Sequence, residues 1–386
     1  MKYHPDRYLQ SRPFVKNILA IHKLKTPSGV LTLDALNAVT DLFMNAYNVA
    51  CFELPMEKRP TDGGLMRNEV SLFMHYANFH RHGINIFDFQ PTLGELLRHT
   101  DVDDVLLSLI KFPYDSFYIA FGLQPHLDLW AQGYFVDGAY VSRVALDDGI
   151  MIEILLTTRR TDIDYRAKSN FILNRDRYYY FPMRLEKIDI NVETALSGSI
   201  MEHRPFTPKD IPDTSGVYEV AGKQVSVFDR GGESQIEDAH ANKEGYPVFL
   251  DALKFVINGL CYLSSPSKEI NTRFPDDAPR GLLGKLGPGR KQAEIARTMS
   301  KLASMGYRKV HFCGDALQKE HTGIPTGREL SAHWRRGHWR NQAYGESFSE
   351  HKLLWIMPTV VRKDKGEPAF GHIYDVKDGS GETTGR

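Results

Sequence analysis

The stretch SAHWRRGHWR, residues 331–340, contains two histidines, two tryptophans and three arginines but no acidic residue. Guanidinium groups bind phosphates and carboxylates through paired hydrogen bonds. Indole rings stack on bases, arginines or peptides, and an imidazole, whose unperturbed pKa is ~6.5, can exchange protons near neutral pH. This composition predicts a binding site in a loop or short strand around Gly337, where glycine permits close backbone approach or an unusual turn.

The binding interpretation applies to nucleic acid or to a partner protein. Its candidate residues in this stretch are His333, Arg335, Arg336, Gly337, His338, Trp339 and Arg340. The alternative is structural, because Trp334 and Trp339 could fill a small core while the arginines pair with acids elsewhere in the chain. The residues that surround the stretch in space decide between the two.

Catalysis is the weakest interpretation of the same stretch. His333 and His338 are five residues apart, so they do not share a helical face as two metal ligands do, and no carboxylate or cysteine stands beside them. His311 and Cys313 alternate on one strand face, but two ligands alone are a weak metal signal. We therefore predict no metal and no cofactor, and we keep His333 and His338 only as weak catalytic candidates.

The formal net charge of zero conceals a basic segment, residues 279–340. It holds thirteen lysines and arginines against four acids, a charge of +9 that leaves −9 on the rest of the chain. Such an excess creates a positive field that attracts phosphates or acidic proteins, although solvated surface charge has the same composition. The segment therefore strengthens the binding interpretation without choosing between nucleic acid and protein.

A helix is expected within this segment, in RKQAEIARTMSKLASMG, with Gly306 as its stop. The spacing of Ile295, Met299 and Leu302 predicts that these three side chains face a core. Cations fall on another face of the same helix and are further binding candidates. They are Arg290, Arg297 and Lys301.

Hydrophobic periodicity predicts an α+β fold: a helical N-terminal region, a mostly antiparallel central sheet, a helical segment and a small basic α/β C-terminal region. VSLFMHYANFHRHG has helical spacing, whereas FPYDSFYIAFG, AYVSRVAL and IMIEILLTT are typical of strands, with a hairpin turn at Asp148-Gly149. The expected boundaries are 1–105 for the helical N-terminal region, 106–206 for the antiparallel β region, 207–242 for a loop or linker, 243–305 for the helical region, 306–375 for the basic C-terminal region and 376–386 for a disordered tail.

The cysteines and the apolar runs indicate the cellular compartment of the protein. Cys51, Cys261 and Cys313 are odd in number, widely spaced and outside any CxxC pair, which argues against a disulfide framework and a zinc finger. No apolar run approaches the ~18 residues of a membrane span, and the N-terminal MKYHPDRYLQSRPF lacks an apolar signal core. We therefore expect a cytoplasmic protein with no membrane partner.

Several stretches together resemble one known family. They are FPYDSFYIAFG, GAYVSRV, CYLSSP, MGYRKVHFCG, H-x-R-R-G-H-W and KLLWIMPTVV, in this order between residues 113 and 361. This arrangement is similar to a family of phage- and plasmid-borne proteins whose best understood type is an anti-CRISPR protein directed against the type V-A Cas nuclease. The specific part is the RRGHW block, residues 335–339, with His333 two residues before it.

The resemblance implies an action on the biosynthesis of that nuclease. Family members recognise the emerging N-terminal peptide of the target during translation, and the target mRNA is then lost. The leading hypothesis is thus a non-catalytic regulator in the cytoplasm of a bacterial host, with a target protein or nascent peptide as partner and a basic C-terminal region on RNA, the ribosome or an acidic partner. The alternatives are a metal-independent ribonuclease using His333 or His338, and an accessory protein of a phage or plasmid that binds nucleic acid without sequence preference.

Overall fold

The structure is a computed structural model of the chain. The described residues are 3–21, 33–52, 63–129, 133–146, 149–161, 179–185, 190–202, 216–220, 223–227, 231–319 and 333–361. The α-helices are α1 (His4–Ser11), α2 (Pro13–Ile21), α3 (Leu33–Phe52), α4 (Gly63–Arg81), α5 (Pro91–Arg98), α6 (Val192–Glu202), α7 (Gly231–Ser264), α8 (Arg280–Leu283) and α9 (Gln292–Ser304). Short 3-10 helices are η2 (Leu107–Leu109), η3 (Pro125–Leu127), η6 (Gly284–Leu286), η7 (Ala316–Lys319) and η8 (Glu346–Phe348).

Among the described residues, the strands form one large mixed sheet and three small ones. They are β1 (Ile86–Phe89), β2 (Thr100–Asp101), β3 (Ser116–Ala120), β4 (Asp128–Leu129), β5 (Tyr134–Leu146), β6 (Gly149–Arg160), β7 (Tyr179–Leu185), β8 (Gly216–Val220), β9 (Lys223–Val227), β10 (Ile270–Arg273), β11 (Val310–Cys313), β12 (His333–Arg335), β13 (Gly337–Tyr344), β14 (Glu350–Ile356) and β15 (Thr359–Val361). The large sheet has the order β10-β11-β1-β3-β5-β6-β7, with β4 beside β5. Only the β1 pairings with β3 and β11 are parallel in it, so the predicted α+β class with a mostly antiparallel sheet is confirmed.

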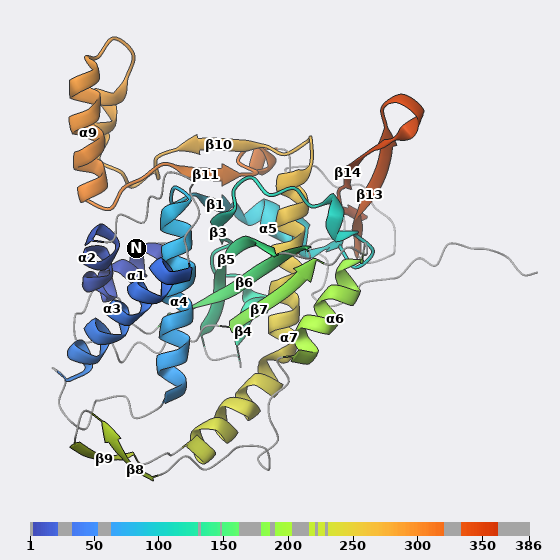
Figure 1. Cartoon of the computed structure of the whole chain (residues 1–386). Helices are drawn as coiled ribbons and strands as arrows, with labels where there is room; N and C mark the ends of the chain where they lie inside the picture. Colours follow the sequence, from blue (N-terminus) through green and yellow to red (C-terminus); the bar gives the residue numbers. More distant parts are fainter. Residues whose placement is uncertain are drawn as a thin grey trace, which may run out of the picture.

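The large sheet has a hydrophobic core on each face because its buried strands carry apolar side chains on both sides. In β3, Phe117 and Ile119 point into a core that includes α7, whereas Tyr118 points into a second core shared with α1 to α4. Figure 1 shows these four N-terminal helices on one side of the sheet and α5, α6 and α7 on the other. The N-terminal and C-terminal parts of the chain therefore both pack against this sheet.

A buried polar network holds α1 on its face of the sheet. The Arg7 guanidinium donates to Asp137 at 2.7 Å, and Thr157 donates to the other oxygen of the same carboxylate at 3.1 Å. The side chains of Arg7 and Asp137 are 1% and 5% exposed. Removing one member of such a pair leaves an uncompensated buried charge, which is strongly destabilising. The N-terminal helices are thus an integral part of the fold rather than an appendage.

Two expectations about secondary structure were wrong in part. The region 1–105, expected to be helical, contributes β1 to the middle of the large sheet, because the short run IFDF is buried on both faces and carries no alternating pattern. The stretch 207–242, expected to be a loop or linker with a short strand possible in VYEVAGKQVSVF, holds β8, β9 and the start of α7. The division into six regions stays a prediction, and the tail 376–386 lies outside the described residues.

Other local expectations were confirmed. Strands β5 and β6 pair as a hairpin in which Leu146 faces Gly149, so the chain reverses between these two residues, one residue before the expected Asp148-Gly149 turn. The helix α9 ends just before Gly306, whose φ of +87° is a left-handed conformation that glycine adopts without strain. Local turn chemistry therefore gave reliable boundaries even where the order of the strands could not be foreseen.

The expectation that no apolar stretch reaches membrane length was too strict. Within the described residues, Gly245–Ser264 of α7 is long and apolar enough to span a membrane by length and composition, with a mean hydropathy of 1.3. In the structure 67% of this window is buried inside the protein. Its apolar residues, among them Leu253, Val256 and Leu260, belong to the larger core. Packing against the sheet therefore accounts for the apolar character of this helix.

Candidate functional site

The SAHWRRGHWR stretch forms two short strands that continue on either side of Arg336. Strand β12 pairs with β15, while β13 lies between β14 and β2. The Gly337 N–H donates to the His99 carbonyl at 2.9 Å. A Cβ atom on Gly337 would lie 2.6 Å from Pro358 Cδ and 2.8 Å from the Ile356 carbonyl oxygen. Of the two roles expected for Gly337, the structure shows close backbone approach.

Trp339 is an anchor that fixes β13 to the core. Its side chain is 8% exposed, and its indole N–H donates to Asn258 Oδ1 on α7 at 2.7 Å. Its ring stacks on Trp355 of β14 with centroids 5.6 Å apart, and the Trp355 indole N–H donates to Thr100 Oγ1 at 3.1 Å. For Trp339 the structural interpretation therefore applies, and its ring is not available to a base in this conformation.

The charged residues of the stretch lie on the outside. Because side chains alternate along a strand, the burial of Gly337 and Trp339 places His338 and Arg340 on the opposite, exposed face. Arg335 and Arg336 are also exposed, and the Arg336 guanidinium has Asp101 at 3.9 Å, which is a long contact. His333 and Trp334 belong to β12, but their side chains lie outside the described residues. The predicted site therefore consists of a buried anchor, Trp339, and an exposed charged face.

The β13–β14 hairpin also exposes an aromatic residue that the sequence analysis did not single out. Phe348, at the tip, is 71% exposed and has a φ of +56°, and the preceding Ser347 has a φ of +55°. Positive φ in a bulky residue is an outlier that local structure must enforce. Figure 1 shows the hairpin standing away from the large sheet. A phenylalanine within the polar run GESFSE was the available sequence signal.

The other predicted binding residues lie on a separate lobe, residues 273–309, which we call the α9 lobe. Arg290, Arg297 and Lys301 are exposed there. Of the three apolar side chains expected to face a core, Leu302 is buried and Ile295 is half-buried. Met299 is 38% exposed, so the expectation was wrong for this residue. The α9 lobe has a small core of its own, made of Phe274, Ala278 and Leu302.

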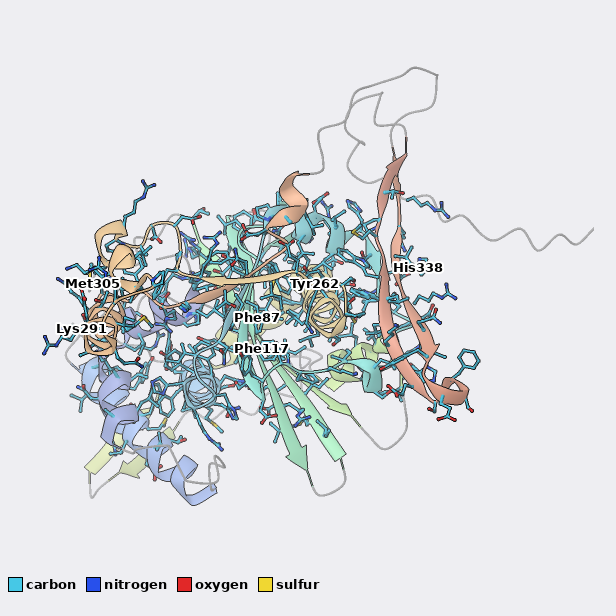
Figure 2. All side chains as sticks on the ribbon, turned by 90° about the horizontal axis from the view of Figure 1, so that it is seen from above. Phe87, Phe117, Tyr262, Lys291, Met305 and His338 are labelled. Atoms are coloured by element: carbon cyan, nitrogen blue, oxygen red, sulfur yellow. The ribbon has the colours of Figure 1, made fainter. Side chains whose placement is uncertain are left out.

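The two basic surfaces do not adjoin. In Figure 1, α9 and the β13–β14 hairpin lie at opposite ends of the molecule. Figure 2, turned by 90°, shows the same separation between Lys291 on the lobe and His338 on the hairpin. The large sheet lies between them in both views. The cations predicted to bind a partner, between Arg290 and Arg340, therefore lie on two separate surfaces.

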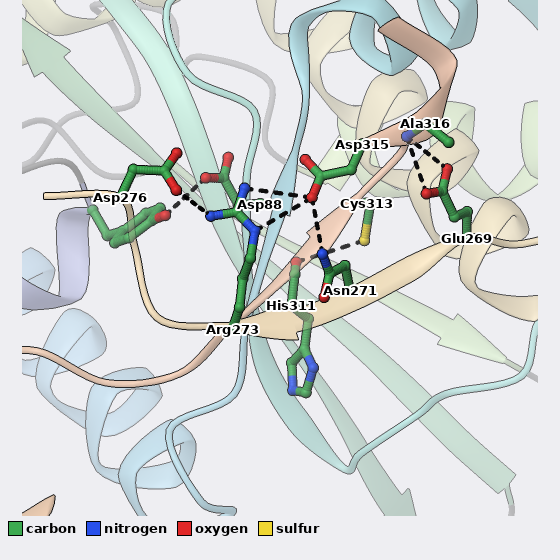
Figure 3. A network of polar contacts seen from close by, with 10 residues as sticks. Asp88, Glu269, Asn271, Arg273, Asp276, His311, Cys313, Asp315 and Ala316 are labelled. Atoms are coloured by element: carbon green, nitrogen blue, oxygen red, sulfur yellow. Dashed lines mark hydrogen bonds and ion pairs between the residues drawn. The ribbon is translucent and has the colours of Figure 1, made fainter. Parts of the chain in front are cut away.

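Strands β10, β11 and β1 carry a polar network that joins the α9 lobe to the sheet (Figure 3). Arg273 binds Asp276 at 2.5 Å and Asp315 at 3.4 Å, and its guanidinium lies 3.9 Å from the centroid of the Phe312 ring. Nearby, Tyr3 donates to Asp88 Oδ2 at 2.7 Å. These contacts hold the strands and the lobe together. They also pair the positive charge of Arg273 with carboxylates of the protein itself.

His311 and Cys313, considered above as conceivable ligands, have other roles. The His311 ring is within 2.8 Å of Thr272 Oγ1 and stacks on Phe87, and desolvation lowers its pKa. Burial raises the pKa of the Cys313 thiol, so the thiolate form that binds metals is disfavoured. Among the described residues, no group of three or more histidines, cysteines and carboxylates could hold a metal ion.

Comparison with known proteins shows the family. The sequence profile described as AcrVA2-like, the anti-CRISPR type V subtype A2 family, matches residues 87–363. This chain belongs to that family. The match begins within β1 and ends just after β15, so it contains the α9 lobe and the hairpin but not α1 to α4. The resemblance inferred from the RRGHW block is thereby confirmed, and membership of the AcrVA2-like family supports an anti-CRISPR function with a Cas-related partner.

Among solved structures, the chain matches one titled "Crystal structure of AcrVA2". The two sequences are 13% identical, the match covers 94% of this chain and 100% of that chain, and the TM-score is 0.40. No curated protein sequence matches the chain.

Proposed function

We propose that this protein is an anti-CRISPR regulator that recognises the nascent N-terminal peptide of a type V-A Cas nuclease and causes loss of the corresponding mRNA. The observation that carries the proposal is the family match over residues 87–363. A protein that recognises a peptide during translation works beside ribosomal RNA and mRNA, where basic surfaces are useful. The two separate basic surfaces, with the large sheet between them, suit such a task.

The outer face of the hairpin is the surface that we assign to RNA or the ribosome. Arg340 is exposed on β13, the strand that the buried Trp339 holds to α7, and Arg335 and Arg336 are exposed just before this strand. Cations that neutralise RNA phosphates release counterions, which gives binding free energy and a strong dependence on salt. The exposed Phe348 ring adds a platform on which an unpaired base can stack. Arg290, Arg297 and Lys301 stay predicted contacts for the same large partner.

A test expresses the chain in a bacterium together with a type V-A Cas nuclease and measures nuclease mRNA and protein. We expect the wild type to lower both and Arg335→Glu/Arg336→Glu to lose most of that effect. Arg297→Glu/Lys301→Glu carries the same charge change on the α9 lobe and should have the smaller effect. Unchanged mRNA and protein with the wild type would remove this target.

Binding in vitro separates direct RNA contact from an acidic partner. If the hairpin binds RNA, Arg335→Ala/Arg336→Ala should weaken binding of a single-stranded oligonucleotide by the purified protein. The slope of log affinity against log salt should also flatten by roughly 0.7 for each phosphate that the variant no longer neutralises. Equal slopes for wild type and variant would assign these arginines to a protein partner.

A further inference from the structure

The α9 lobe contains an open groove that the sequence analysis did not anticipate. It has a volume of ≈ 800 Å³ and lies between the α8–η6 segment, the start of α9 and the end of β10. Most of its wall is apolar. The apolar side chains are Phe274, Pro275, Leu283, Leu286, Ile295 and Met299. Met299, the residue expected in a core, is exposed because it lines this groove.

The charged side chains of the groove are predominantly cationic. Arg273, Arg280 and Lys309 line it together with a single acid, Asp276. Arg273 is neutralised by Asp276 and Asp315. Arg280 and Lys309 are exposed, and neither has an ion-pair partner among the described residues. The groove thus presents two cations that an incoming ligand can pair with.

The charge of the surrounding lobe has the same sign. Residues 279–309 contain eight lysines and arginines and one acid, Glu294, a net charge of +7. Only Arg308 among these cations is bound within the described residues, to Asp6 at 2.8 Å. A field of this sign attracts acidic ligands and raises their association rate. The ligand should therefore carry carboxylates or phosphates as well as apolar groups.

Peptide fits the walls of the groove better than RNA does. Unpaired bases bind chiefly by stacking on aromatic or guanidinium planes. The exposed wall is instead aliphatic, with Met299 in it, and the one aromatic ring, Phe274, is 9% exposed. Aliphatic and methionine-lined grooves between helices take the apolar face of an amphipathic helix.

We propose that this groove binds an acidic amphipathic peptide segment of a partner protein, with Ile295 and Met299 against its apolar face and Arg280 and Lys309 paired with its carboxylates. The inference rests on the proposed function, because it names the surface and the chemistry by which a target segment would be held. It differs from the predicted binding residues of α9. At 100° per residue, Arg297 and Lys301 lie on the side of α9 away from Ile295 and Met299.

The experiment titrates the full-length protein into a fluorescein-labelled peptide of about 16 residues, with leucines at i, i+3, i+4 and i+7 and glutamates between them. Three probes of similar length control for chemistry: the same residues scrambled, the same pattern with lysine in place of glutamate, and single-stranded oligouridine. The variants are Arg280→Glu/Lys309→Glu for the rim and Met299→Asp for the wall. Arg297→Glu/Lys301→Glu is the matched control, with the same charge change on the far side of α9.

The expected result is saturable binding of the acidic amphipathic peptide and not of the scrambled or lysine forms. Reversing the two rim charges should lower its affinity at least about tenfold, while the matched control changes it less than about twofold. Met299→Asp should also weaken it, and circular dichroism checks that each variant is folded. Absence of peptide binding, binding of oligouridine alone, or equal loss in the rim and control variants would overturn the inference. Because the titration contains no nuclease, its outcome tests the groove separately from the loss of mRNA in cells.

Discussion

The β13–β14 hairpin and the α9 lobe carry parts of the same basic stretch of sequence but use their charges differently. In the hairpin, alternate residues of one strand are buried. The buried Trp339 therefore anchors the strand whose opposite, exposed face carries Arg340. In the lobe, a small core of Phe274, Ala278 and Leu302 supports a helix with cations on its far side and a groove on its near side. The number of charged residues in the sequence does not distinguish an exposed charged face from a cationic groove. The positions of the apolar residues distinguish the two.

The largest expected effect is that of Trp339→Ala, which tests whether the hairpin is anchored by this ring. The substitution removes a buried indole, its stacking on Trp355 and its hydrogen bond to Asn258. We expect the free energy of unfolding, measured in urea, to fall by about 3 to 5 kcal/mol. Arg340→Ala, on the exposed face one residue away, should change it by less than about 0.5 kcal/mol. Similar values for both variants would mean that the hairpin is not held by its buried side.

A smaller loss is expected where the lobe is tied to α1. Arg308 pairs with Asp6 at 2.8 Å, and their side chains are 24% and 16% exposed. Arg308→Leu should lower the free energy of unfolding by about 2 kcal/mol, because it leaves a largely buried carboxylate without its cation. Asp6→Asn/Arg308→Leu, which removes both charges, should recover much of that loss. No recovery in the double variant would show that the carboxylate is not the cause.

The loss should also depend on pH in a defined direction. Burial raises the pKa of Asp6, and Arg308 opposes that rise. A carboxyl whose folded-state pKa is raised stabilises the fold below its unfolded pKa, and that contribution is lost as the pH rises through the folded pKa. Without Arg308 the folded pKa rises further, so the defect of Arg308→Leu should be larger at pH 7 than at pH 4.5. A defect of equal size at both pH values would contradict this origin.

The same substitution at two glycines should have opposite signs in the two regions. Gly337→Ala brings a Cβ atom within 2.6 Å of Pro358 and should lower the free energy of unfolding by about 1 to 2 kcal/mol. Gly281→Ala, in α8, places the Cβ in open space and should raise it by about 0.5 kcal/mol. Loss of stability at Gly281 would show that the lobe is more tightly packed than the structure indicates.

The smallest expected effect is that of His338→Gln. His338 is exposed, and its neighbours across the ladder are Ile356 and Asp101. The Asp101 carboxylate already accepts the Asp103 N–H at 3.0 Å and faces Arg336. A regulator that acts by binding should retain loss of target mRNA to within about twofold of wild type. Abolished mRNA loss with unchanged binding would instead support the ribonuclease alternative.

Features that depend on local sequence patterns could be predicted better than features that depend on the pairing of strands far apart in the sequence. The aromatic and β-branched runs of β3, β5 and β6 and the turn before Gly149 were sufficient to predict the meander. The four-residue β1 could not be recognised, since its place beside β3 and β11 depends on strands far along the chain. In the site, alternation about Gly337 already separates Trp339 from Arg340. The groove needed the structure, because α8, α9 and β10 build it together.

The central claim is that the target is recognised as a peptide during its synthesis. The most direct measurement is the amount of target mRNA in cells that express this chain with three versions of a type V-A nuclease gene. One has natural N-terminal codons, one has synonymous codons, and one encodes an altered N-terminal peptide. We predict mRNA loss for the first two versions and none for the third. Loss that follows the codons rather than the peptide would contradict the claim.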